Sequence, residues 1–323
     1  MKNLILIPLY LLTSFNGWAS KGPFFGVVPD ETPRLLAPNL IMSPFTEYNG
    51  AFNPAGTEFY YTISIPGKIQ GFQGIIAYTQ LKKDGTWSPP LIAPFSGEYS
   101  DYDPIFSPDG SKLYYSSRRP LPNKPESIQN NVWFVERNDH GWGQPQLIKL
   151  TDKGNTYNSL TRSGTLYFNT WSTGEMLTAD KKKDGTYEIK TLPFPVNSEG
   201  NYDGDPFVSP EGDYLIFRRD RGQGTLGKGD LFITFNIKGV WTDPENLGEP
   251  INSKDHEMCP SVTPDGKIFI FSSNRKYADY QLNPNTPVID IIDKYKSADN
   301  GRENIYYMST GFIEKFRQRH IRQ

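Results

Sequence analysis

The chain has 323 residues, a formal net charge of −2 and one cysteine. The near balance of charges excludes a general electrostatic attraction to nucleic acid or to an anionic membrane, and a single cysteine excludes an internal disulfide. Aromatic residues make up 14% of the chain, which also has 29 glycines and 27 prolines, a composition typical of short strands joined by tight turns.

Residues 1–19 have the pattern of an export signal. Lys2 supplies a positive start, residues 4–12 form an apolar run, and Gly17 and Ala19 flank Trp18 in a small-x-small cleavage site. Polar residues interrupt the run before it reaches the roughly 20 apolar residues that a membrane anchor needs. We therefore expect a mature chain that begins at Ser20, has no membrane span and is periplasmic or secreted.

Five copies of one motif follow at intervals of 48 to 54 residues. Each copy has a short strand, a turn and a second strand of aromatic and aliphatic residues, which predicts an antiparallel hairpin. The third copy departs most, because Arg162 replaces the turn proline and the second strand is one residue shorter. The period is that of propeller blades. The turn glycines are Gly56, Gly110, Gly164, Gly212 and Gly266.

A third strand and a fourth, outer strand are expected in each copy except the last. Aromatic residues open the outer strands, and we assign them to packing between blades rather than to sugar stacking: Trp87, Trp142, Tyr187 and Trp241. The last copy lacks an outer strand, whereas residues 33–40 resemble one without a hairpin before it. The sequence thus predicts an all-β, five-bladed β-propeller of four-stranded antiparallel blades, with the ring closed by the N-terminal strand completing the last blade.

The motif resembles the TolB-like β-propeller repeat, a relative of the WD-type repeats. Residues 106–110 (Phe-Ser-Pro-Asp-Gly) with 116–118 (Ser-Ser-Arg) match it closely, as do 262–266 (Val-Thr-Pro-Asp-Gly) with 272–275 (Ser-Ser-Asn-Arg). The resemblance covers nearly all of the mature chain. It implies the fold, and it implies that the protein is a periplasmic docking platform, a glycan binder or, occasionally, an enzyme.

Two loops of every blade are expected to meet at one mouth of the central channel. Nine residues before each turn glycine stand Glu47, Asp101, Asn155, Asp203 and Glu257, and seven before it stand Asn49, Asp103, Tyr157, Asp205 and Cys259. The second strands bring Arg118, Arg119, Arg218, Arg219, Arg221 and Arg275 to the same face. Binding residues concentrate on loops held by a rigid scaffold. The predicted ligand-binding set is Glu47, Asn49, Asp101, Asp103, Tyr157, Asp203, Asp205, His256, Glu257, Arg118, Arg218 and Arg275. In the structural alternative, the carboxylates cap backbone amides and the arginines lock blades together.

The sequence predicts no cofactor, although calcium stays open. Asp101-x-Asp103 and Asp203-x-Asp205 could supply oxygen ligands to calcium, but neither lies in an Asp-x-Asp-x-Asp-Gly loop. Three histidines in the whole chain disfavour a multi-histidine metal site. Residues 222–227 match a dinucleotide fingerprint formally, yet no helix follows them. Cys259 is expected to be a buried, inert thiol.

Two further segments carry predictions. Within the insertion at residues 276–303, Val288, Ile291, Ile292 and Tyr295 would share one face of a short helix that begins after Pro287, and we expect it to pack on the functional face as a lid, a partner-binding knob or a structural cover. The basic stretch 315–322 is interpreted as a solvated end.

The sequence favours a non-catalytic exported propeller that binds a glycan, a peptide or a protein partner, such as an envelope protein, on the central-channel face. The alternative is a carbohydrate-active enzyme, a glycoside hydrolase or polysaccharide lyase, that uses carboxylates on the same face as acid and base or nucleophile. A wholly structural role is a third possibility. An enzyme should hold one carboxylate protonated by burial near another.

Overall fold

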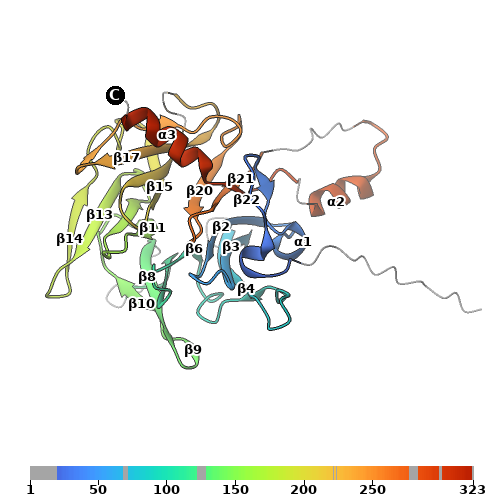
Figure 1. Cartoon of the computed structure of the whole chain (residues 1–323). Coiled ribbons are helices and arrows are strands. Elements are labelled where there is room, and N and C mark those ends of the chain that lie inside the picture. Colours follow the sequence, from blue (N-terminus) through green and yellow to red (C-terminus); the bar gives the residue numbers. More distant parts are fainter. Residues whose placement is uncertain are drawn as a thin grey trace, which may run out of the picture.

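The computed structural model is a five-bladed β-propeller in which each blade is a small antiparallel sheet (Figure 1). It describes residues 20–67, 72–121, 129–220, 222, 224–275, 283–297 and 300–321. The predicted export signal at 1–19, Arg221 and part of the insertion (276–282 and 298–299) lie outside the described residues. The fold class predicted from the repeats is confirmed.

The blades follow one another along the chain. Blade 1 contains β2 (Thr46–Phe52), β3 (Glu58–Pro66), β4 (Phe72–Gln80) and β5 (Leu91–Ile92). Blade 2 contains β6 (Asp101–Phe106), β7 (Lys112–Ser117), β8 (Asn131–Asn138), β9 (Gly141–Trp142) and β10 (Gln146–Ile148). Blade 3 contains β11 (Asn155–Leu160), β12 (Leu166–Thr170), β13 (Met176–Lys181) and β14 (Tyr187–Thr191). Blade 4 contains β15 (Tyr202–Val208), β16 (Tyr214–Asp220), β17 (Gly229–Ile237), β18 (Val240–Trp241) and β19 (Glu245–Asn246). Blade 5 contains β20 (Glu257–Val262), β21 (Ile268–Ser273), β22 (Asn304–Ser309) and β1 (Arg34–Leu35).

The N-terminal strand closes the ring, as the missing outer strand of the last copy predicted. β1 pairs antiparallel with β22, with Arg34 opposite Tyr307 and Leu35 opposite Tyr306. The N–H of Leu36 donates to the carbonyl of Ile305 at 2.9 Å, and the Leu36 side chain is fully buried. Closure removes the open edge that β22 would otherwise expose.

Aromatic residues of the outer strands pack between neighbouring blades. The indole N–H of Trp142 in blade 2 donates to the hydroxyl of Tyr60 in blade 1 at 2.8 Å, and Trp241 of blade 4 lies edge-on to Tyr167 of blade 3. These rings bury apolar area while their polar atoms find partners. They therefore hold the blades against one another.

The C-terminal segment is a helix, α3 (Gly311–Ile321), and not a solvated end. Its Ile313 and Phe316 are buried in an apolar cluster that includes residues of blades 4 and 5, and Arg317 pairs with Asp213 at 2.7 Å. Figure 1 shows α3 lying across these blades. The interpretation of this segment as a solvated end was wrong. The basic stretch contains few apolar residues, and their spacing did not indicate an amphipathic helix.

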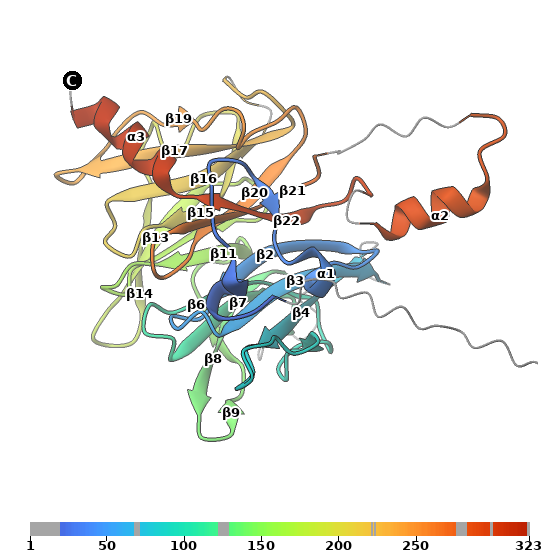
Figure 2. The ribbon, with the colours of Figure 1, turned by 45° about the vertical axis from the view of Figure 1, so that its right-hand side comes forward.

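The insertion contains α2 (Val288–Lys296), but this helix has no buried residue. It stands away from the blades (Figure 2), and its apolar residues, among them Val288 and Tyr295, are exposed. The expected packing on the functional face is therefore not found. Two short helical turns, η1 (Pro23–Gly26) and α1 (Pro38–Ile41), flank β1.

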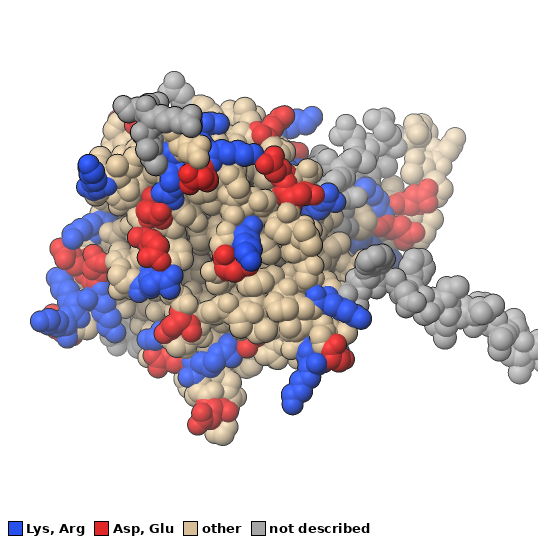
Figure 3. All heavy atoms as spheres, in the orientation of Figure 1, with Lys and Arg blue, Asp and Glu red and all other residues tan. Residues whose placement is uncertain are grey.

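Charges are dispersed over the surface. On the face shown in Figure 3, acidic and basic side chains alternate without a large patch of one sign, in keeping with the net charge of −2. No helix among the described residues is long and apolar enough to cross a membrane.

Candidate functional site

All five inner strands are bulged at the same place. The register of each inner strand against its neighbour shifts by at least one residue there, and the residue seven before the turn glycine has a left-handed backbone. The φ angles are 48° at Asn49, 58° at Asp103, 40° at Tyr157, 53° at Asp205 and 52° at Cys259. A left-handed backbone costs a residue with a Cβ about 1–2 kcal/mol, so the surrounding structure must hold these bulges in place.

Four of the bulges are held by a side chain of the preceding blade. In each case the buried N–H of the bulge residue donates to a neutral side-chain oxygen on the second strand of that blade. The bonds run from Asp103 to Thr62 Oγ1 (3.1 Å), from Tyr157 to Ser116 Oγ (3.1 Å), from Asp205 to Asn169 Oδ1 (3.2 Å) and from Asn49 to Ser272 Oγ (3.1 Å). We call these positions the acceptor ring.

The fifth position of the acceptor ring is Arg218, which has no acceptor atom. Arg218 stands opposite Gly204 in blade 4, just as Ser116 stands opposite Tyr102 in blade 2. The N–H of Cys259 turns instead to the carboxylate of Asp205, at 3.3 Å from Oδ2. The same Oδ2 atom lies 3.1 Å from Nη1 of Arg218. The junction between blades 4 and 5 is thus the one place where charged groups replace a neutral bond.

A pocket of about 560 Å³ opens beside this junction. The bulge residues Asp103, Asp205 and Cys259 line it, as do Arg218 and Asp220. The remaining lining is largely aromatic: Tyr48, Phe72, Tyr102, Trp171 and Tyr202, with Thr156, Ser172 and Met258. An apolar cavity with a few convergent polar groups is the usual form of a small-molecule site.

Arg218 is held from three directions. Its Nε lies 3.0 Å from Asp220 Oδ1, an ion pair without hydrogen-bond geometry, and its guanidinium stacks over the Tyr202 ring at 5.0 Å. Together with the ion pair to Asp205, these contacts fix the orientation of the guanidinium group and compensate its positive charge.

The carboxyl group of Asp103 has a raised pKa. Burial, with the Asp205 charge as the next cause, raises the pKa of Asp103 to about 7. Its Oδ1 accepts a hydrogen bond from Asn49 Nδ2 at 3.1 Å and its Oδ2 accepts one from Ser116 Oγ at 3.2 Å. The carboxyl group can therefore hold or release a proton near neutral pH while its position stays fixed.

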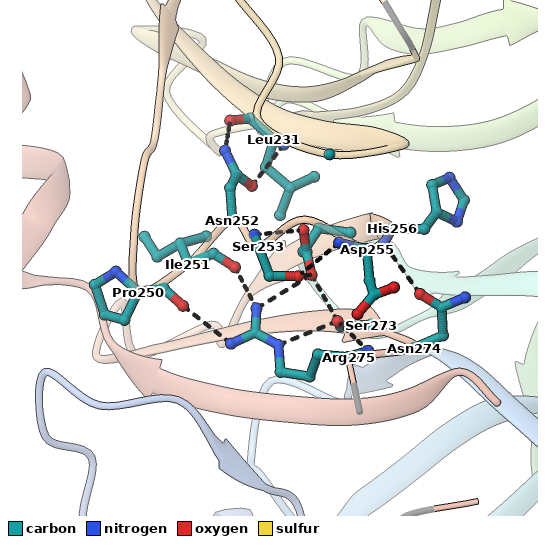
Figure 4. Close-up of polar contacts among 12 residues, drawn as sticks. Leu231, Pro250, Ile251, Asn252, Ser253, Asp255, His256, Ser273, Asn274 and Arg275 are labelled. Atoms are coloured by element: carbon teal, nitrogen blue, oxygen red, sulfur yellow. Dashed lines mark hydrogen bonds and ion pairs between the residues drawn. The ribbon is translucent and has the colours of Figure 1, made fainter. Parts of the chain in front are cut away.

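The residues nine before the turn glycines have a different environment. They are buried, they do not line the pocket, and they accept hydrogen bonds that tie the entering loop to the blade. Glu257 accepts from the N–H of Ser253 at 2.8 Å and from Ser273 Oγ at 2.7 Å, and it lies 3.3 Å from Arg275 Nη2. Figure 4 shows Arg275 also reaching the carbonyl oxygens of Pro250 and Ile251.

The arginine–carboxylate clamp recurs in blades 2 and 4, whereas Glu47 of blade 1 is held by its entering loop. Asp101 pairs with Arg119 at 3.1 Å and Asp203 with Arg219 at 2.6 Å. Glu47 accepts from the N–H of Ser43 at 3.0 Å, and burial raises its pKa to about 8.

Four other members of the predicted set lie near the pocket without lining it. Asn49 supports Asp103, and the Tyr157 hydroxyl donates across the channel to the carbonyl of Pro260 at 2.6 Å. His256 Nε2 lies 3.6 Å from Asp220 Oδ1. Arg118 stacks on two lining rings, Phe72 at 5.2 Å and Trp171 at 5.8 Å.

Sequence reasoning missed the aromatic wall. Trp171 stands in blade 3 where Arg118 stands in blade 2, directly after the second strand, and this equivalence was hidden by the shorter strand of the third copy. Tyr102 precedes the bulge residue Asp103, and the bulge turns it toward the pocket. No group of three or more metal-ligating side chains occurs in the described part of the chain.

The contact between blades 4 and 5, where Arg218 stands in place of a neutral acceptor, leads to a prediction about stability. We call this contact the broken junction. Arg218→Ser would restore a neutral oxygen to the acceptor ring, but it would leave the Asp205 carboxylate buried without its partner, which costs about 3–5 kcal/mol. We expect Arg218→Ser to lower the free energy of unfolding by about 3 kcal/mol. The double variant Asp205→Asn with Arg218→Ser removes the stranded charge, and Asn tolerates the left-handed backbone.

Urea unfolding at pH 7 measures both variants. The double variant should regain most of the stability that the single variant loses. A single variant as stable as the wild type, or a double variant no better than the single, would contradict the structural account of this junction.

Comparison with known proteins supports the fold. No protein-family model matches the sequence, and no curated protein matches it. Among solved structures, arabinanase Arb43A of Bacillus subtilis is 10% identical with a TM-score of 0.51, and the match covers 84% of this chain and 96% of that one. A GH43 endo-arabinanase from Bacillus licheniformis is 12% identical with a TM-score of 0.50, over 82% of this chain and 94% of that one.

TolB from Acinetobacter baumannii is 15% identical with a TM-score of 0.45; the match covers 83% of this chain and spans 55% of the length of TolB. These identities are too low to carry activity across, and no family model supports the resemblance to the TolB-like repeat. What the comparisons establish is that the chain is similar in fold to the two arabinanases over most of its length.

Proposed function

We propose that the protein binds a glycan in the pocket on the central-channel face. The observation that carries this proposal is the composition of the pocket: five aromatic rings surround a small set of buried, rigidly held polar groups. Sugars present apolar faces and a rim of hydroxyls, so aromatic planes and charged hydrogen-bonding groups suit them together. Hydrogen bonds between blades hold the bulge residues of the pocket in place. This rigidity lowers the entropic cost of ordering the site when a ligand binds.

The polar groups that line the pocket include both hydrogen-bond donors and acceptors. Arg218 offers N–H donors, the Asp205 carboxylate is an acceptor, and Asp103 can be either as its proton is held or released near pH 7. A ligand with several hydroxyls can use all three. The export signal predicted at residues 1–19 supports a periplasmic or secreted location, where envelope glycans are available.

Trp171 offers the sharpest test, because it lines the pocket and is 46% exposed, so its removal should leave the fold intact. We expect Trp171→Ala to weaken glycan binding at least tenfold, because stacking area is lost. The matched control is Tyr295→Ala, an aromatic on α2 that is 42% exposed and does not line the pocket.

Calorimetric titration of the mature chain with an oligosaccharide panel measures the effect. Equal weakening by both variants, or glycan binding that Trp171→Ala leaves unchanged, would contradict the assignment of the pocket. Binding of an envelope protein, with no glycan bound, would replace the proposal with the protein-partner alternative.

A second candidate, cleavage of a glycosidic bond, is favoured by one specific observation. Burial, and next to it the charge of Asp205, raises the pKa of Asp103 to about 7, so that Asp103 can hold a proton near neutral pH, as a general acid must. In this candidate Asp103 is the general acid, and Asp205 is the ionised partner held by Arg218.

The pH dependence of this candidate has a definite sign. A general acid acts in its protonated form, so cleavage should be full below about pH 6 and should fall as the pH rises through the Asp103 pKa of about 7. New reducing ends or unsaturated products are measured on a polysaccharide panel. Asp103→Asn should abolish cleavage while the oligosaccharide still binds. Absence of products on every polysaccharide across pH 4–9 would remove this candidate and leave binding alone.

A further inference from the structure

Arg118 is the exception among the arginines that stand in or shortly after the second strands. Four others each have a carboxylate partner: Arg119 with Asp101 (3.1 Å), Arg218 with Asp205 (3.1 Å), Arg219 with Asp203 (2.6 Å) and Arg275 with Glu257 (3.3 Å). Arg118 makes no ion pair within the described ranges. Its Nε donates to Asn130 Oδ1 at 3.0 Å, and its Nη1 is buried without any hydrogen-bond partner.

An uncompensated guanidinium in this position is costly. Arg118 is only 8% exposed, and a buried charge without a counter-charge loses much of its hydration energy. Buried polar atoms without partners are rare in folded proteins, and each calls for an explanation. The ring faces of Phe72 and Trp171 on either side return a part of the lost energy through cation–π contact, but they supply no acceptor for the N–H groups.

Tyr102 has the same deficiency at the same place. Its hydroxyl is buried with no partner at hydrogen-bond geometry, and the residue is 4% exposed. Burial raises the pKa of Tyr102, and the neighbouring Arg118 acts against this shift. Arg118 is therefore a neighbour of the hydroxyl, and Tyr102 also lines the pocket.

We infer that Arg118 and Tyr102 form a carboxylate-binding subsite at the edge of the pocket, next to its lining rings Phe72 and Trp171, and that the ligand is an acidic glycan with a uronic-acid residue. This inference rests on the proposed glycan-binding function and narrows it to a substrate class. The planar fork of Arg118 matches a carboxylate, and the Tyr102 hydroxyl donates a further hydrogen bond to it.

The other charges of the pocket are consistent with this assignment. Arg218 is already shared by Asp205 and Asp220, so Arg118 is the cation that remains for a ligand. In this subsite the sugar ring stacks on Phe72 or Trp171, and its carboxylate is directed to Arg118, which contacts both rings. Stacking and charge then act on the same sugar residue.

The test uses the mature full chain and a panel of uronic-acid trisaccharides, each in the free-acid form and as the uncharged methyl ester. Calorimetric titration should show at least tenfold tighter binding of one free acid over its ester. Arg118→Gln should abolish this preference, and Arg118→Lys should restore it in part, because charge is kept while the fork is lost. Tyr102→Phe should weaken binding of the acid and leave that of the ester unchanged. Arg162→Gln, a surface arginine outside this pocket, is the control.

The outcomes separate the inference from the function on which it rests. Esters or neutral sugars that bind as tightly as the acids, with Trp171→Ala still weakening them, would overturn the uronate inference and leave the glycan site standing. Preference for O-sulfated trisaccharides over uronates would also overturn it. If no saccharide binds at all, the proposed function fails, and the inference fails with it. A thermal unfolding midpoint of Arg118→Gln equal to that of the wild type shows that the loss is one of binding and not of folding.

Discussion

The channel mouth depends on hydrogen bonds that cross from one blade to the next. Each inner strand is bulged at a residue with a left-handed backbone. That backbone is held by a neutral oxygen of the preceding blade at four junctions. Each bond joins a bulge to the blade before it, and the bond from Asn49 to Ser272 joins blade 1 to blade 5 and so depends on closure of the ring, in which β1 completes the last blade. Local strain at the mouth and the overall architecture are therefore parts of one constraint.

The candidate site arises where the repeat departs from that constraint. Thr62, Ser116, Asn169 and Ser272 are scaffold residues at the same position of their blades, and Arg218 is the exception. At the ends of the second strands, the blades likewise carry dissimilar side chains, including Arg118, Trp171 and Asp220. A symmetric scaffold offers five equivalent positions, and the ones that differ in chemistry gather around a single pocket. Strained backbone and perturbed proton affinity concentrate there, as is common at functional sites.

The sequence was sufficient to predict the fold because the information is repeated. Five turns with the same spacing, and a strand at the wrong end of the chain, are enough to predict both the blades and their closure. Parts of the site were also accessible: Asp103, Asp205 and Arg218 follow from counting back and forward from the turn glycines. Long-range placement of α2 was not, since amphipathic spacing predicts a helix but not what, if anything, covers it.

The division between clamp and site could not be predicted from spacing. Strict alternation puts Asp101 and Asp103 on one face of a strand, yet the bulge separates them, so that Asp101 meets Arg119 within the blade while Asp103 reaches the pocket. A single bulged residue decides which of two carboxylates is accessible. Trp171 was hidden for a related reason, because one residue fewer in β12 moves it out of register with Arg118.

The most direct test of this account is to titrate the mature protein with an oligosaccharide that binds it and to follow the NMR chemical shifts of the backbone amides and of the tryptophan indole N–H groups. The account predicts that the largest shifts occur at the amides of Asp205 and Cys259 and at the indole of Trp171, because the broken junction and the aromatic wall form one site. Amides of the turn glycines Gly110 and Gly266, on the other side of the ring, should stay unchanged. Shifts that gather at those turns while the Cys259 amide stays still would place the ligand elsewhere and contradict the account.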